Sequence, residues 1–194
     1  MAVLPVAVQD PSRLLETDAI DLGISVFPPG PGWQRQESLM TMNLCCVYDP
    51  RQLDLKPPLT RAQYLAYPHL LISLQSGFEG LVNDALAAFG RQRDILYSTP
   101  RLGALPFFLQ RTPVLATVPE YVGREWSALF GLQSSPLPLR IAPLAVSAIW
   151  HAKRDGDEAL RWLRTLIAAI VAAGSRSGGR SRLRIAKPSS PRRR

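Results

Sequence analysis

The sequence has few of the residues on which disulfide frameworks and membrane anchors depend. Only Cys45 and Cys46 are cysteines, and adjacent residues of a strand point to opposite faces, so a vicinal disulfide is disfavoured. This cysteine usage favours a reduced, cytoplasmic protein. The longest apolar run, Leu166–Ala173, is far shorter than the roughly 20 residues that a membrane-spanning helix needs. The apolar start, Met1–Val8, lacks a basic segment, so we expect neither a signal peptide nor a membrane span.

Patterns that carry catalysis or metal binding are also missing. Neither His69 nor His151 has an acidic residue or a cysteine at ligand spacing, which predicts no metal site. The Gly30–Gly32 segment has proline where a phosphate-binding loop needs backbone donors, and there is no serine elbow or Cys/His pair. We therefore predict a protein that is not an enzyme, without catalytic residues, metals or cofactors. His69 is expected to be structural, and His151 to be a surface residue without a function.

The excess of basic charge is concentrated at one end of the chain. The net charge is +8, from 23 basic and 15 acidic residues, and the segment 175–194 holds eight of the basic residues and no acid. The remaining 15 basic residues equal the acidic ones, so the rest of the chain is formally neutral. Residues 174–194 lack apolar periodicity, which predicts a disordered basic tail. Such a tail can bind nucleic acid weakly through phosphate contacts, and a solubilising role is equally open.

Short apolar segments alternate with helical patterns along the rest of the chain. Ser12 is a candidate N-cap of the first helix, and Gly90 suits the left-handed position after the third. Alternating strands and helices predict an α/β fold with parallel sheets. Strands are predicted at 3–8, 20–25, 44–48, 70–74, 94–98 and 114–118 and within 137–149, and helices at 12–17, 59–65, 80–89, 102–109, 119–130 and 157–173.

Three stretches carry a resemblance to a known family. Leu15–Ile24 is similar to the pattern L-x-x-G-x-(I/L)-D-(L/A)-(A/G)-I, with Asp18 where glycine is usual. Pro68–Ser73 with Asn83–Arg93 resembles p-H-v-l-v-s followed by v-D-x-a-L-a-x-x-G-x-x-R. Trp150–Arg154 with Asp157–Arg164 resembles W-H-x-R followed by D-x-A-x-x-W-L-R. The ordered set, over about residues 2–170, resembles the effector (substrate)-binding domain of LysR-type transcriptional regulators.

The resemblance implies a fold like type 2 periplasmic binding proteins, in which two lobes with parallel-rich sheets are joined by two crossover strands. Lobe one would comprise 1–50 and 143–173 and lobe two 51–142, with the crossings near 48–51 and 141–145. The segment 3–8 aligns with the family's second strand, so lobe one is expected to be incomplete at its N-terminus. The family's winged helix-turn-helix is not in this sequence. DNA would then be contacted only through a missing N-terminal domain, or weakly through the tail.

The resemblance also implies a small-molecule effector in the cleft between the lobes and pairing as a homodimer. Ligands in such folds bind at the carboxyl ends of strands. Arg101 is a candidate carboxylate partner or a solvated side chain, and Thr99 a ligand contact or a helix N-cap. The expected co-inducer is aromatic or carboxylated. The alternatives are a stand-alone solute-binding protein and an inactive fragment of a truncated regulator. The candidate ligand-binding residues are Gly23, Ser25, Phe27, Ser73, Gln75, Thr99 and Arg101.

Overall fold

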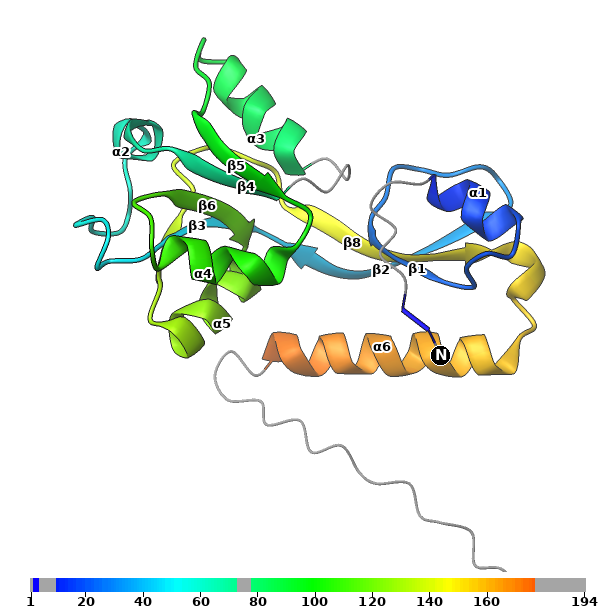
Figure 1. Ribbon diagram of the computed structural model, residues 1–194. Helices are drawn as coiled ribbons and strands as arrows, with labels where there is room; N and C mark the ends of the chain where they lie inside the picture. The colour runs from blue at the N-terminus through cyan, green and yellow to red at the C-terminus, as the bar shows by residue number, and fades with distance from the viewer. Residues whose placement is uncertain (1, 4–9, 73–77, 177–194) are drawn as a thin grey trace, which may run out of the picture.

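The strands form two separate sheets in the computed structural model, which describes residues 2–3, 10–72 and 78–176 (Figure 1). One sheet has five strands in the order β5–β4–β6–β3–β7, and the other has three in the order β1–β8–β2. The predicted α/β class is confirmed. The strands are β1 Gly23–Val26, β2 Gln34–Met42, β3 Leu44–Tyr48, β4 His69–Ile72, β5 Ile95–Thr99, β6 Leu115–Pro119, β7 Gln133–Pro136 and β8 Leu144–His151.

The five-stranded sheet is mixed. Strand β4 pairs in parallel with β5 and β6, whereas β3 pairs antiparallel with β6 and β7. The three-stranded sheet is antiparallel throughout, since β1 and β2 both pair with the long strand β8. The prediction of parallel βα units is correct for β4, β5 and β6. The described strands of the smaller sheet are antiparallel instead. The strand predicted at 3–8 lies largely outside the described residues.

Helices cover both faces of the five-stranded sheet (Figure 1). Helices α4 and α5 contribute to the apolar cluster on one face, and α2 and α3 to the cluster on the other. Two 3-10 turns, Leu102–Ala104 and Ala152–Arg154, precede α4 and α6. The helices are α1 Pro11–Glu16, α2 Arg61–Ala66, α3 Phe78–Ala87, α4 Leu105–Leu109, α5 Glu120–Phe130 and α6 Glu158–Arg176. The tail predicted from residue 174 therefore begins inside α6, and residues 177–194 lie outside the described part.

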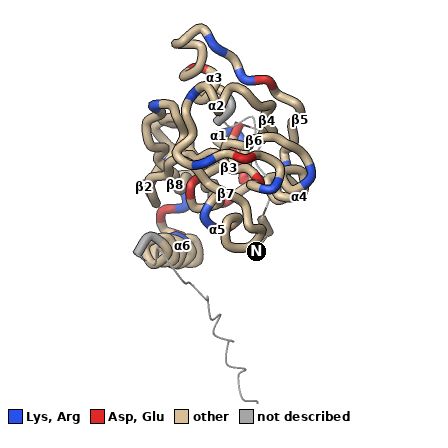
Figure 2. The backbone as a smooth tube through the Cα atoms, turned by 90° about the vertical axis from the view of Figure 1, so that its left-hand side faces the viewer, with Lys and Arg blue, Asp and Glu red and all other residues tan. Residues whose placement is uncertain are grey.

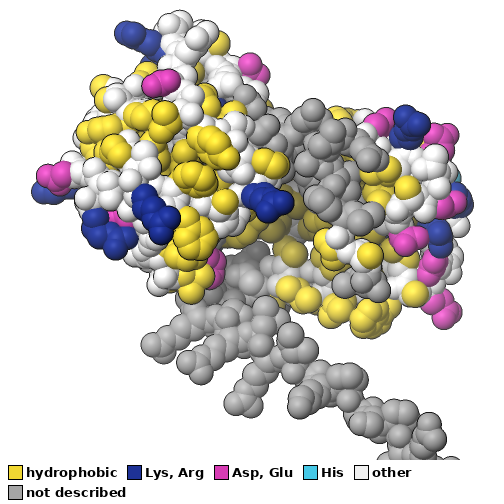
Figure 3. All heavy atoms as spheres, viewed as in Figure 1, with side chains coloured by type: hydrophobic (Ala, Val, Ile, Leu, Met, Phe, Trp, Pro, Cys, Tyr) yellow, Lys and Arg dark blue, Asp and Glu magenta, His cyan; other side chains and the backbone are white. Residues whose placement is uncertain are grey.

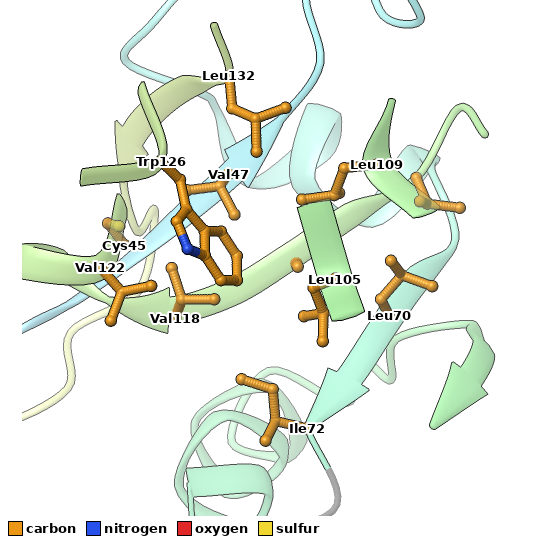
Figure 4. Packing of buried hydrophobic residues seen from close by; sticks show 12 residues of the cluster. Cys45, Val47, Leu70, Ile72, Leu105, Leu109, Val118, Val122, Trp126 and Leu132 are labelled. Carbon is orange, nitrogen blue, oxygen red and sulfur yellow. The ribbon is translucent and has the colours of Figure 1, made fainter. Parts of the chain in front are cut away.

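The main core follows the alternation of side chains along strand β3, which lies between β6 and β7. Cys45 and Val47 face the α4–α5 side, and Cys46 and Tyr48 face the α2–α3 side, as expected for neighbouring residues of a strand. Figure 4 shows the first of these clusters, in which Trp126 of α5 packs over Val47. All four strand residues are at most 2% exposed. Burial on both faces places β3 between the two core clusters of the larger sheet.

The position of β3 corrects one expectation. The sequence analysis assigned 44–48 to lobe one and placed the first crossing near 48–51. In the structure β3 is bonded to β6 and β7, because its two buried faces need helices on both sides, so the chain passes between the sheets at Asn43. The return passage lies between Pro136 and Leu144.

Helix ends follow ordinary capping chemistry, with one correction. The N-cap of α1 is Asp10, whose carboxylate accepts from the backbone N–H of Ser12 at 2.9 Å, and not Ser12 as predicted. Asp10 caps the helix because a carboxylate before Pro11 reaches the first free N–H groups of the helix. Thr60 and Gln63 form a reciprocal capping box at the start of α2. Gly90 has φ +63°, which confirms the predicted left-handed position after α3.

Asp18, which stands in place of the family's usual glycine, has a left-handed backbone with φ 55°. Its carboxylate receives Lys153 Nζ at 2.7 Å, and this contact lowers the pKa of Asp18. Asp18→Gly and Asp18→Ala both lose the ion pair with Lys153, but only Asp18→Ala keeps a Cβ on the left-handed backbone. We expect Asp18→Gly to melt a few degrees above Asp18→Ala in calorimetry. Equal melting temperatures would show that the backbone strain at this position is negligible.

Helix α6 lies along the smaller sheet and makes a narrow contact with it. Leu160 packs with Ala148 and Trp150, and the guanidinium of Arg164 lies 3.8 Å from the Trp150 ring centroid. Trp162, in contrast, is 66% exposed. The smaller sheet therefore has a thin core, and the larger sheet provides most of the buried apolar surface.

Candidate functional site

The carboxyl ends of β4, β5 and β6 lie together at one edge of the five-stranded sheet. Ile72 at the end of β4 is paired in register with Thr99 at the end of β5, and Pro119 ends β6 directly before α5. In Figure 1 these three strands run toward the side on which the smaller sheet lies. An edge of this kind is where α/β folds place ligands, because loops and helix N-termini converge there.

Thr99 and Arg101 form a local turn at this edge. Thr99 is buried, and its Oγ1 accepts a hydrogen bond from the backbone N–H of Arg101 at 3.1 Å. Thr99 is therefore not a helix N-cap, which was the alternative prediction for it. Arg101 occupies the cap position of the following 3-10 helix. The Arg101 side chain is exposed and has no ion pair among the residues that the structure describes. Its guanidinium is thus free to receive a carboxylate.

The candidates in the smaller sheet lie on and after β1. Gly23 is buried beside Ile149 of β8, and a Cβ built on Gly23 would lie 2.9 Å from Ile149 Cγ1 and 3.3 Å from Phe27 Cζ. Close packing is thus a sufficient reason for glycine at this position. Ser25 pairs with Ser147, and both Ser25 and Phe27 are half-buried.

The structure brings the candidate residues together in two groups. Thr99 and Arg101 belong to the larger sheet, and Gly23, Ser25 and Phe27 to the smaller one. Ser73 and Gln75 lie outside the described residues. A cavity of about 20 Å³ beneath α3 has room for one water molecule, and an open groove of about 550 Å³ lies between α2 and the end of α3. None of the five candidates that the structure describes lines either space.

Two buried polar residues beneath α3 were not proposed as site residues. The His69 ring is fully buried, its Nε2–H donates to the carbonyl of Tyr64 at 2.7 Å, and burial lowers the pKa of His69 to about 4. The guanidinium of Arg93 donates to Asn83 Oδ1 at 2.8 and 3.2 Å. His69 begins β4, at the opposite end from Ile72, so it serves the core of this sheet. The resemblance includes Asn83 and Arg93, but no pattern showed their contact.

The two cysteine thiols are not exposed for chemistry. Cys45 and Cys46 are free and buried, and burial raises the pKa of both thiols, which disfavours the reactive thiolate. Within residues 10–72 and 78–176, no three His, Cys, Asp or Glu side chains are grouped closely enough to hold a metal ion. None of the helices in these ranges is long and apolar enough to cross a bilayer.

Comparison with known families identifies the class of this protein. Residues 3–171 match the model of the LysR substrate binding domain, and the chain belongs to this family. The match covers both sheets, the passage between them at Asn43 and most of α6. The recognition made from the three sequence stretches is confirmed.

Individual relatives agree with the family assignment. The chain is 29% identical to the HTH-type transcriptional activator NahR of Pseudomonas putida over 155 residues, which cover 80% of this chain and 52% of NahR. It is 30% identical to the HTH-type transcriptional regulator SyrM of Rhizobium etli, with coverage of 84% and 48%. The chain thus spans about half the length of these curated relatives.

Solved structures share the fold. The regulatory domain of MexT, a transcriptional activator in Pseudomonas aeruginosa, superposes with a TM-score of 0.72 at 28% identity and covers 81% of this chain and 78% of that domain. The effector binding domain of QuiR, solved in complex with shikimate, superposes with a TM-score of 0.68 at 12% identity, with coverage of 83% and 76%. The second likeness shows the fold alone.

Proposed function

We propose that this chain is the effector-binding part of a LysR-type transcriptional regulator and binds a small aromatic or carboxylated co-inducer between its two sheets. The proposal rests on the family match over residues 3–171. The structure over this range has two sheets, and the chain passes between them twice. Such a hinged pair of lobes responds to a ligand only by the difference in affinity between its open and closed forms. The division into two lobes is part of this proposal.

The strand edge supports a carboxylate as the recognised group. Arg101 presents an exposed guanidinium next to the buried Thr99, at the carboxyl ends of parallel strands. A guanidinium forms bidentate, charge-assisted bonds with a carboxylate, and these are stronger than neutral hydrogen bonds. From the smaller sheet, Gly23, Ser25 and Phe27 are proposed to contact the body of the ligand, together with Ser73 and Gln75.

A melting-temperature screen against aromatic and aliphatic carboxylic acids tests the proposal. A co-inducer at 100 times its Kd is expected to stabilise the chain by about 2.7 kcal/mol, which corresponds to several degrees. Arg101→Gln should reduce the shift strongly, and Arg111→Gln, an exposed arginine after α4, is the matched control. Flat melting curves with every acid, or equal shifts in both variants, would count against the proposal.

Two other functions are separated by the same screen and one further measurement. A stand-alone solute-binding protein would also respond to a ligand, but it would be recovered outside the cytoplasm in cell fractionation. An inactive fragment would fold and bind none of the acids. The proposal places the protein in the cytoplasm, without enzymatic activity.

We also propose that the whole regulator forms a homodimer and contacts DNA. Figure 3 shows hydrophobic side chains gathered over the α3, β5 and α4 side of the larger sheet, where Leu96, Tyr97 and Phe107 are about half exposed. This face is a candidate surface for a second copy, and sedimentation of the chain measures whether it dimerises.

Along the described backbone, acidic and basic residues are interspersed (Figure 2). DNA contact is therefore proposed through a separate N-terminal domain or weakly through the basic segment 175–194.

A further inference from the structure

The open groove between α2 and the end of α3 combines two cations with an apolar lining. Its volume is about 550 Å³, which is within the range of small-molecule sites. Arg61 and Arg91 stand at the groove, and the other lining residues are Ala62, Leu65, Ala66 and Phe89. No acidic residue is among them. The groove lies on the α2–α3 side of the larger sheet, away from the strand edge that carries Thr99 and Arg101 (Figure 1).

Among the described residues, the two arginines have no acidic partner. Within the part of the chain that the structure describes, neither Arg61 nor Arg91 forms an ion pair or donates a side-chain hydrogen bond. Each guanidinium carries five N–H donors and no acceptor, and both side chains are exposed, so both can offer these donors to a ligand at the groove. Two like charges at one groove are stabilised by an anion placed between them.

The exposed ring of Phe89 holds one of these cations in place. The guanidinium carbon of Arg61 lies 3.8 Å from the Phe89 ring centroid, and the ring is 54% exposed. A guanidinium stacked on a ring keeps its N–H edges directed outward, in the plane that suits a carboxylate. Leu65 and the two alanines beside it offer apolar surface for a hydrocarbon body. The lining therefore matches a ligand with an anionic head and an apolar body.

We propose that this groove is a second binding site, distinct from the site between the sheets, for a small organic carboxylate with an apolar body. Arg61 and Arg91 bind the carboxylate, and Leu65 and Phe89 contact the body. The proposal goes beyond the co-inducer site, because neither Arg61 nor Arg91 is among the residues assigned to that site.

Nuclear magnetic resonance of the full 194-residue chain, titrated with benzoate, tests the proposal. Benzoate is expected to shift the side-chain Nε–H signals of Arg61 and Arg91 and the amide signals of Ala62 and Ala66. Benzamide has the same ring without the charge and should bind at least about tenfold more weakly, since charge-assisted bonds are the stronger ones. Arg61→Gln/Arg91→Gln should raise the benzoate Kd at least about tenfold.

Arg101→Gln is the control that separates this site from the site between the sheets. The proposal requires that Arg101→Gln leave the benzoate shifts at Ala62 and Ala66 unchanged. The proposal is overturned if these shifts are absent at about 10 mM benzoate. Their absence would mean a binding free energy weaker than about 3 kcal/mol. It is also overturned if they persist with the same Kd in Arg61→Gln/Arg91→Gln. Because both arginines are exposed, that variant is expected to keep the wild-type melting temperature, which verifies its folding.

Discussion

Lowering the pH from about 7 to about 4.5 is expected to reduce the free energy of unfolding by about 2.5 kcal/mol through His69 alone. The ring is fully buried, and burial together with the nearby Arg93 lowers the pKa of His69 from 6.5 to about 4, although the bond to the Tyr64 carbonyl acts in the opposite direction. The measurement is urea denaturation at a series of pH values.

The sign follows from which state binds the proton. Between pH 6.5 and about 4 the unfolded chain protonates His69 and the folded chain does not, so stability falls as the pH falls through this window. The contribution of His69 is complete above 6.5. Asp18, Asp49, Asp155 and Asp157 have lowered pKa values, so they lose their stabilising contribution in a separate window, below 3.8.

A pair of histidine variants isolates the effect. His69→Gln keeps a donor for the Tyr64 carbonyl and cannot titrate, so its stability should be nearly flat across the same window. His151→Gln is the matched control. His151 stacks on Trp33 with ring centroids 4.5 Å apart and is partly exposed, so this variant should retain the acid sensitivity of the wild type. An unchanged pH dependence in His69→Gln would show that other groups cause it.

The parts of the fold that could be predicted from the sequence are those with strong local chemistry. The run Leu44–Tyr48 is uniformly apolar because β3 is covered on both faces, and its limits were predicted as observed. Gly90 was placed at a left-handed position because few residues tolerate that backbone. The family resemblance supplied the order of the elements, which local patterns alone do not determine.

Strand β2 shows why the rest could not be predicted. Its sequence, Gln34–Met42, is largely exposed and shows no alternation of apolar and polar residues. The strand forms because its backbone pairs with β8 over nearly its whole length, with an irregularity between Ser38 and Met40. Such pairing depends on a partner more than 100 residues away in the chain, so no local pattern indicates it. The pairing of β3 with β6 and β7 likewise depends on distant parts of the chain.

The sequence predicts which strand ends carry the candidate site, but it does not predict the contacts that the site residues make. Thr99 and Arg101 could be proposed because residues that follow a strand lie at the ligand edge of an α/β sheet. The Thr99–Arg101 bond and the packing of Phe27 against Gly23 depend on backbone geometry that residue types do not specify. The groove at Arg61 and Arg91 joins residues 30 positions apart and has no motif.

Adding a single methyl group at Gly123 is expected to cost about 1–3 kcal/mol of stability, because α5 lies so close to the buried strand β3 that the core has no space for it. A Cβ at this position would lie 2.5 Å from Cys45 Sγ, 3.1 Å from Ser134 Oγ and 3.3 Å from Val47 Cγ1. Val47 and Cys45 belong to the buried β3, which cannot move without disturbing both core clusters. The strain should therefore exceed the gain of about 1 kcal/mol that alanine normally brings to a helix.

The partner atom in this clash can be tested by a double-mutant cycle. Gly123→Ala/Cys45→Ala removes the sulfur that the new methyl group meets, so its cost should be smaller than the sum of the two single costs by about 1 kcal/mol or more. Gly80→Ala in α3 is the control, since a Cβ there meets no atom within 4 Å, and it should be neutral or slightly stabilising. Additive costs in the cycle would show that the clash lies elsewhere, and a neutral Gly123→Ala would mean that α5 is not held against β3 as closely as these distances require. Denaturant unfolding of the wild type and the four variants measures each cost directly.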